Sequence, residues 1–148
     1  MRVATLVAKR AALSAEFAAI RARCADEAPA RLPLVLVVDD DPTQLMLLRE
    51  ALRGTARVVL QRYPEDALSV ALEVDFDAVL LDIHMPEMSG YEFARRLHEV
   101  RPGAPIIAAT GDDAVNLHAL NGTGARVLHL PKPFRMDEAR RMVEEALA

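Results

Sequence analysis

Cysteine is nearly absent from this chain: Cys24 is the single one among 148 residues. A single cysteine excludes an internal disulfide and is typical of proteins from a reducing compartment. Long apolar runs are absent as well, and none approaches the roughly 20 residues that a membrane-spanning helix needs. Near the N-terminus, the apolar stretch 3–8 is interrupted by Lys9 and Arg10 and is too short for a secretory signal. We therefore expect a cytoplasmic protein without membrane insertion.

Aromatic residues are scarce, at 4% of the chain, and tryptophan is missing. This composition argues against a surface on which nucleic-acid bases stack. The net charge of −4 argues against a basic surface for the nucleic-acid backbone, so we expect no direct nucleic-acid partner. In contrast, 52% of the residues are hydrophobic. A chain of this length and composition is typical of about one domain with a well-developed core.

The first segment, residues 1–25, is predicted to form an N-terminal helix, because it is rich in Ala, Leu and Arg and contains no Gly or Pro. Seven positions in it recur at alternating three- and four-residue steps: Val3, Leu6, Arg10, Leu13, Phe17, Ile20 and Cys24. Two interpretations of this stripe stay open. The helix either lies on its own domain or forms a short coiled coil in a homodimer. Residues 26–33 contain two prolines and are predicted to be a linker.

From Leu34 onward, short apolar runs alternate with helical patterns, which predicts a single domain over residues 34–148. The predicted strands cover 34–38, 57–61, 78–81, 105–109 and 126–130. The predicted helices cover about 42–53, 64–73, 91–100, 112–121 and 135–147. Continuous Val- and Leu-rich runs are typical of parallel strands buried on both faces. Strict alternation of strands and helices through short loops predicts a doubly wound α/β fold.

Polar residues follow four of the predicted strands: Asp39, Asp40 and Asp41 after the first, Asp82 after the third, Thr110 after the fourth and Lys132 after the fifth. In a parallel sheet these strand ends meet at one edge, where ligands bind. Carboxylates gathered there would repel one another without a cation between them. Oxygen ligands of this kind suit Mg²⁺, and a hydroxyl with an ammonium beside the metal suits a phosphoryl group.

Each of these residues also has a purely structural interpretation. Asp41 precedes Pro42 and is best read as the N-cap of the next helix. Thr110 is equally suited to cap the fourth predicted helix, and Lys132 to lie in solvent. Taken singly, these interpretations are the simpler ones. If all of these structural interpretations held, four strand ends would carry residues suited to a metal ion and a phosphoryl group by coincidence alone.

Four segments in chain order identify a family resemblance: V-V-D-D-D-P (37–42), D-I-H-M-P-E-M-S-G (82–90), I-I-A-A-T-G (106–111) and L-P-K-P-F (130–134). With them, residues 33–148 resemble the receiver domain of two-component response regulators. The resemblance implies a flavodoxin-like, five-stranded parallel sheet of order 2-1-3-4-5, with the N-terminal helix as an addition. It also implies a signalling phosphoacceptor rather than an enzyme. Its partners would be a histidine kinase or histidine phosphotransfer protein and a downstream protein target.

Residue roles follow from the same resemblance. Asp82 matches the phosphorylated residue. Asp39, Asp40, Asp82 and the main-chain carbonyl of His84 match the Mg²⁺ ligands.

The resemblance also assigns the residues of the switch. Thr110 matches the switch hydroxyl, and Lys132 matches the ammonium that pairs with the phosphoryl group, with the Lys132–Pro133 bond usually cis. The family's switch aromatic is replaced by His129. A histidine there either follows the same inward–outward motion, with a charge that changes near neutral pH, or simply faces solvent on an edge strand.

Two other classes of function compete with this interpretation. Asp39-x-Asp41-x-Thr43 fits the nucleophile signature of haloacid-dehalogenase-like phosphohydrolases. That family also needs a later acidic pair, and the available one, Asp137–Glu138, falls inside a predicted helix. A receiver-like module that only binds partners is the second alternative, disfavoured because every site position holds a competent residue. Output is not specified by the sequence: the chain is either a stand-alone regulator or the receiver of a hybrid kinase, with the N-terminal helix then acting as a connector.

Overall fold

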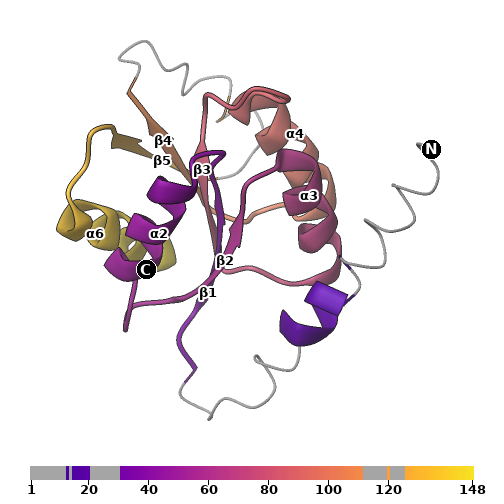
Figure 1. The fold of residues 1–148 in the computed structure, drawn as a ribbon, viewed down its shortest axis with the longest axis horizontal. Coiled ribbons are helices and arrows are strands. Elements are labelled where there is room, and N and C mark those ends of the chain that lie inside the picture. The colour runs from indigo at the N-terminus through magenta and orange to yellow at the C-terminus, as the bar shows by residue number, and fades with distance from the viewer. Residues whose placement is uncertain (1–12, 14, 21–30, 112–119, 121–125) are drawn as a thin grey trace.

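The computed structural model describes residues 13, 15–20, 31–111, 120 and 126–148. These residues form a parallel sheet between two layers of helices (Figure 1). Helices α2 (Pro42–Ala51) and α6 (Met136–Leu147) cover one face, and α3 (Pro64–Glu73) and α4 (Gly90–Val100) cover the other. Each layer closes over one hydrophobic cluster, so the core is divided in two by the sheet.

The sheet has five strands in the order β2-β1-β3-β4-β5, all parallel to their neighbours. The strands are β1 (Leu34–Val38), β2 (Arg57–Gln61), β3 (Ala78–Asp82), β4 (Ile106–Thr110) and β5 (Val127–Pro131). This topology confirms the predicted doubly wound, flavodoxin-like fold. The edge strands are β2 and β5, and β1 and β3 lie at the point where the strand order reverses, which is where such sheets bind ligands.

Burial on both faces explains why the central strands read as continuous apolar runs. In β1, Val35 and Val37 face the α2–α6 cluster, whereas Leu36 and Val38 face the α3–α4 cluster. All five residues of β1, β3 and β4 are buried. The edge strands are only partly covered, and their sequences are correspondingly more polar.

Local capping sets where the helices begin. The Thr43 N–H donates to the Asp41 carboxylate at 2.9 Å, and Pro42 occupies the first turn, which confirms the predicted N-cap of α2. Helix α4 begins at Gly90, one residue earlier than predicted, because the Ser89 hydroxyl accepts the Glu92 N–H at 3.2 Å. For the other helices and strands that the structure describes between residues 31 and 111 and after residue 125, the boundaries lie within two residues of those predicted.

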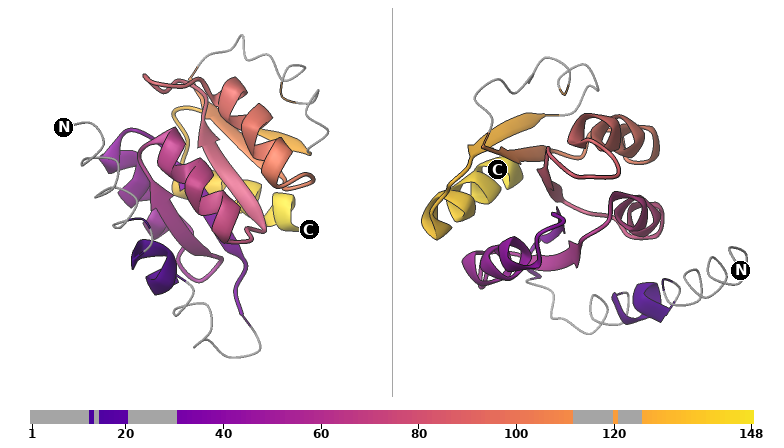
Figure 2. Two further views of the ribbon diagram at one scale, coloured as in Figure 1. Left: turned by 90° about the vertical axis from the view of Figure 1, so that its right-hand side faces the viewer. Right: turned by 45° about the horizontal axis from the view of Figure 1, so that its top comes forward.

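Part of the N-terminal segment is described, and residues 13 and 15–20 are helical there. Ile20 is 2% exposed and belongs to the α3–α4 cluster, and Phe17 packs against that cluster. This piece lies at the β2 end of the sheet next to α3 (Figures 1 and 2). The described part of the apolar stripe therefore packs on its own domain, as the first of the two interpretations expects. The homodimer stays a prediction.

Other predicted features lie outside the described residues. These are most of the predicted helix 112–121, apart from Leu120, which is helical and buried, and the linker up to residue 30. The division into helix, linker and domain stays a prediction. Within the described ranges, none of the helices has the length and apolar character needed to cross a membrane.

Candidate functional site

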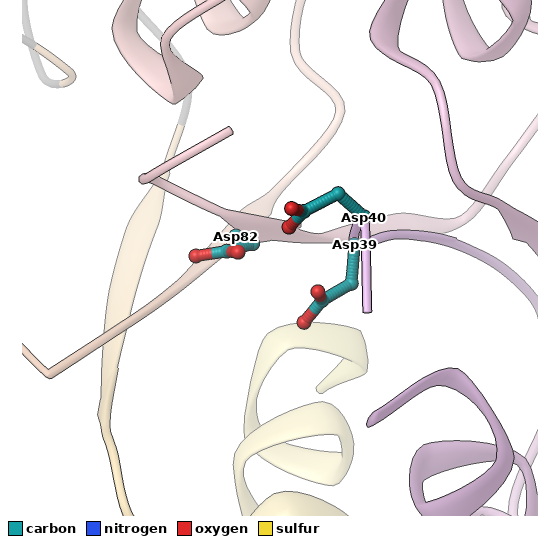
Figure 3. Close-up of side chains that lie close together, drawn as sticks. All are labelled: Asp39, Asp40 and Asp82. Atoms are coloured by element: carbon teal, nitrogen blue, oxygen red, sulfur yellow. The ribbon is translucent and has the colours of Figure 1, made fainter. Parts of the chain in front are cut away.

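Three carboxylates meet at the carboxyl edge of β1 and β3. Asp39 and Asp40 directly follow β1, and Asp82 is the last residue of β3. The two strands pair so that Val38 lies beside Leu81. The next residue after each of them is an acid, Asp39 after Val38 and Asp82 after Leu81. One oxygen from each carboxylate lies within 4.8 Å of the others, and Figure 3 shows the three side chains gathered at the strand ends. Asp39 and Asp82 are only 2% and 6% exposed, whereas Asp40 is half-buried.

The turns after the strands hold two of these carboxylates in place. Asp39 accepts the Asp41 N–H at 2.9 Å, and Asp82 accepts the His84 N–H at 3.1 Å. Each bond comes from the residue two positions later, so the turn that ends the strand also orients the acid. The position of the His84 main-chain carbonyl as a metal ligand stays a prediction.

Lys132 brings the positive charge of the site. Its ammonium lies 3.3 Å from Asp39 Oδ2 and 3.5 Å from Asp82 Oδ1, and its side chain is 23% exposed. The interpretation of Lys132 as a solvated surface lysine is therefore wrong. The main-chain N–H of Lys132 donates to the Thr110 carbonyl at 2.8 Å, which joins the loop after β5 to the end of β4. The Lys132–Pro133 peptide bond is cis, as the resemblance implies.

The two remaining predicted residues occupy β4 and β5. Thr110 ends β4 and is 1% exposed, so it lies at the same sheet edge as the acids. His129 lies opposite Ala108 in the register of β4 and β5. It is half-buried, and its Nε2 is buried without a hydrogen-bond partner among the residues that the structure describes. His129 therefore does not join the carboxylate cluster.

Burial raises the pKa of both buried acids. For Asp82, loss of solvent is the largest cause, and the Asp40 charge raises its pKa further, whereas Lys132 and the His84 N–H oppose the shift. For Asp39, burial again raises the pKa most, against the Asp41 N–H and Lys132. One lysine thus offsets only part of the charge of three acids. The site favours an added cation.

The donor set fits Mg²⁺. Three carboxylates supply hard oxygen ligands, which Mg²⁺ and Ca²⁺ prefer over nitrogen or sulfur. Within the described ranges, Asp39, Asp40 and Asp82 are also the acids grouped closely enough to share one ion. The half-buried position of Asp40 leaves a side open to solvent, where water or phosphate oxygens would complete the coordination.

The loop after β2 is a contributor that the sequence did not single out. Arg62 Nε lies 3.4 Å from the Asp40 carbonyl, and the guanidinium stacks 5.6 Å from the centroid of the Tyr63 ring. Gln61, just before it, accepts the Asp39 N–H on its carbonyl at 3.1 Å. No sequence pattern marks an exposed arginine in a short loop as part of a site.

Gly90 has a role that goes beyond breaking the chain. A Cβ at this position would lie 2.7 Å from Ile83 Cα and 3.1 Å from the Asp82 carbonyl. The Gly90 N–H also donates to the Ile83 carbonyl at 2.8 Å. The first turn of α4 therefore packs directly on the backbone that presents Asp82.

The geometry speaks against the phosphohydrolase alternative. Asp41, the second acid of its signature, is exposed and caps α2, and it lies outside the carboxylate cluster of the described residues. Asp137 and Glu138 lie in the first turn of α6. Asp82, at the end of β3, instead belongs to this cluster and lies 3.5 Å from the Lys132 ammonium.

The parallel sheet and its acid–lysine edge define a doubly wound α/β domain with a candidate cation site where the strand order reverses. A family model for the response regulator receiver domain matches residues 35–144. The chain belongs to this family, and it is a receiver domain, the phosphoacceptor module of two-component signalling.

Relatives and solved structures agree with this assignment. The chain is 35% identical over 116 residues to the transcriptional regulatory protein ZraR of Salmonella typhimurium, in a match that covers 77% of this chain and 26% of ZraR. It thus spans about a quarter of the length of that relative. The BeF3-activated receiver domain of DrrB, from Thermotoga maritima, is similar with a TM-score of 0.69 and 32% identity, over 78% of this chain and 97% of that one.

A second similar structure contains a metal ion. The receiver domain of the sensor histidine kinase PA1611 from Pseudomonas aeruginosa is described with a magnesium ion in its active-site cleft. It is similar with a TM-score of 0.69 and 26% identity, over 78% of this chain and 98% of that one.

Proposed function

We propose that Asp82 accepts a phosphoryl group from a phosphohistidine of a histidine kinase or phosphotransfer protein, with Mg²⁺ bound by the acidic cluster. The observation that supports this most is the position of Asp82: it ends the central strand β3, 3.5 Å from the Lys132 ammonium and within 4.8 Å of Asp39 and Asp40. Asp39, Asp40, Asp82 and the His84 carbonyl would hold the metal.

The transfer needs little covalent chemistry from the protein. An Asp82 carboxylate oxygen forms a bond to phosphorus while the bond from phosphorus to the imidazole nitrogen breaks, and the imidazole then takes up a proton. Lys132 offsets the charge of the equatorial phosphoryl oxygens, and the His84 N–H keeps the carboxylate oriented. When bound, Mg²⁺ supplies further charge compensation at the transferring group.

The switch follows from the new charge on Asp82. An acyl phosphate brings about two negative charges and three acceptor oxygens to the strand ends. Thr110, at the end of the neighbouring β4, is the hydroxyl that would be drawn toward them. Movement of the β4 end would then change the surface that a partner reads, a two-state response to a local charge.

The acceptor assignment is tested by labelling with Mg²⁺ and beryllofluoride or acetyl phosphate. We expect Asp82→Asn to lose labelling and Asp41→Asn to keep it. Asp41→Asn is the matched control, because asparagine also caps helices and Asp41 lies outside the cluster of described acids. Labelling that survives in Asp82→Asn, or is lost in Asp41→Asn, would contradict the assignment and favour the phosphohydrolase alternative.

The wider setting belongs to the same proposal. The chain would act without an enzymatic activity beyond its own phosphorylation and dephosphorylation, in the cytoplasm, and through a downstream protein rather than nucleic acid. A transcriptional regulator and a sensor kinase both stand among the similar proteins, so regulator and hybrid-kinase contexts are both represented. A pull-down with and without beryllofluoride tests whether a partner reads the phosphorylated state.

A further inference from the structure

The N-terminal strap, defined here as residues 15–20, packs on the domain with one side only. Phe17 and Ile20 contact the hydrophobic cluster that also contains Val59 of β2 and Val70 of α3. The alanines at positions 15, 18 and 19 are exposed. The family match begins at residue 35, so this contact is an addition to the receiver fold.

A polar contact joins the strap to the end of β2. Gln61 Nε2 donates to Glu16 Oε1 at 2.6 Å, a short bond to a charged acceptor. Gln61 is 7% exposed. If the strap left, the Gln61 amide would exchange this charged partner for water.

The same residue contacts the acidic site through its main chain. The Gln61 carbonyl accepts the Asp39 N–H at 3.1 Å, and Arg62 Nε lies 3.4 Å from the Asp40 carbonyl. Gln61 therefore binds the strap with its side chain and the acidic pair with its backbone. Two contacts separate Glu16 from Asp39.

We infer that the strap regulates the acidic site: docking of residues 15–20 and binding of a divalent cation at Asp39, Asp40 and Asp82 favour each other. A docked strap restrains the β2 end on which Asp39 is hydrogen-bonded. The Glu16 carboxylate also adds negative charge at that end. Both effects strengthen cation binding. Because the coupling is a free energy between two sites, Mg²⁺ must in turn stabilise the docked strap by the same factor.

Because the chain contains no tryptophan, a single introduced tryptophan can report on docking of the strap without a second tryptophan in the background. In the full chain, Phe17→Trp places one fluorophore on the docked side of the strap. Ile20→Glu in this background is expected to undock the strap and shift the emission to longer wavelength. Ala19→Glu is the matched control, because it adds the same charge at the neighbouring exposed position.

Mg²⁺ affinity is then measured by calorimetry on the same proteins. We expect Ile20→Glu to weaken Mg²⁺ binding by at least about fivefold, the low end of typical coupling between sites, and Ala19→Glu to leave it unchanged. Glu16→Ala, a milder change that keeps the apolar contacts, is expected to weaken binding less and in the same direction. If Ile20→Glu fails to fold, the Mg²⁺ affinity of Glu16→Ala tests the coupling in its place.

Hydrogen exchange gives the reciprocal readout. Saturating Mg²⁺ is expected to slow amide exchange in residues 15–20 by the same factor, and to have no such effect in Asp40→Ala. Emission that shifts while Mg²⁺ affinity stays constant would overturn the coupling, and emission that does not shift in a folded Ile20→Glu would overturn the docking.

This regulation concerns the site proposed above and rests on that proposed function, but the two fail separately. A wild-type chain that binds Mg²⁺ and takes no beryllofluoride refutes the phosphoacceptor role of Asp82 and leaves the coupling measurable. A wild-type chain that takes up beryllofluoride, combined with an unchanged Mg²⁺ affinity in undocked Ile20→Glu, refutes the coupling alone. A wild-type chain that binds no Mg²⁺ refutes the coupling and the metal part of the proposed function together.

Discussion

Replacing Asp82 with asparagine is expected to stabilise the metal-free protein. The asparagine side chain would keep the acceptor for the His84 N–H and remove one charge from a buried cluster. At 4.8 Å and an effective dielectric constant near 20, each repulsion from Asp39 and Asp40 is worth about 3.5 kcal/mol. The attraction to Lys132 at 3.5 Å is worth about 4.7 kcal/mol on the same basis. On this basis the repulsions and the attraction balance to within about 2 kcal/mol. Burial is the largest cause that disfavours the Asp82 charge, so its relief carries the expected gain.

The assay is urea unfolding followed by far-ultraviolet circular dichroism, with a chelator present at pH 7. We expect the free energy of unfolding to rise by about 2 kcal/mol in Asp82→Asn, and to change by less than about 0.5 kcal/mol in the exposed Asp41→Asn. Mg²⁺ should then stabilise the wild type more than Asp82→Asn. An unchanged or lower stability of Asp82→Asn without metal would refute the reasoning.

The dependence on pH provides a second check. The pKa of Asp82 is raised in the folded state above its ordinary value of 3.8. The folded protein therefore holds the proton more tightly than the unfolded chain, and stability is lost as the pH rises through this interval. The advantage of Asp82→Asn should be largest near neutral pH, shrink as the pH falls through the raised pKa, and lose its charge-dependent part below 3.8.

Three further variants test individual parts of the structure. Gly90→Ala is expected to cost about 1–3 kcal/mol of unfolding free energy, because its Cβ would overlap Ile83 Cα, and to reduce beryllofluoride uptake; urea unfolding and labelling measure both. Asp41→Ala should cost about 0.5–2 kcal/mol through loss of the α2 cap while Mg²⁺ affinity by calorimetry stays constant. His129→Ala should keep phosphorylation and weaken partner binding in a pull-down; unchanged partner affinity would contradict a role of His129 in switching.

The convergence of the acids and Lys132 was predictable because parallel strands send all their carboxyl ends to one edge. Knowing that Asp39, Asp82 and Lys132 follow strands was therefore enough to place them together. Burial on both faces likewise made β1, β3 and β4 visible as apolar runs. These features depend on the order of the strands along the chain and on the spacing of apolar residues, and both are visible in a sequence.

Contacts between single side chains were not predictable in the same way. Glu16 and Gln61 lie 45 positions apart, and no repeating pattern links them. Arg62 contributes through proximity to a carbonyl, which any long polar side chain in that loop would permit. The start of α4 was missed by one residue because Ser89 and Gly90 were read only as a break, although Ser89 caps the helix.

The bond from the Lys132 N–H to the Thr110 carbonyl has a mechanical consequence. It continues the β4–β5 ladder one step past Pro131 and joins Thr110, the last residue of β4, to Lys132 in the loop after β5. A pull on Thr110 is then transmitted to the backbone of Lys132. The outer pair of strands is therefore coupled at this edge, so that a displacement of Thr110 or of Lys132 would be passed to the other residue.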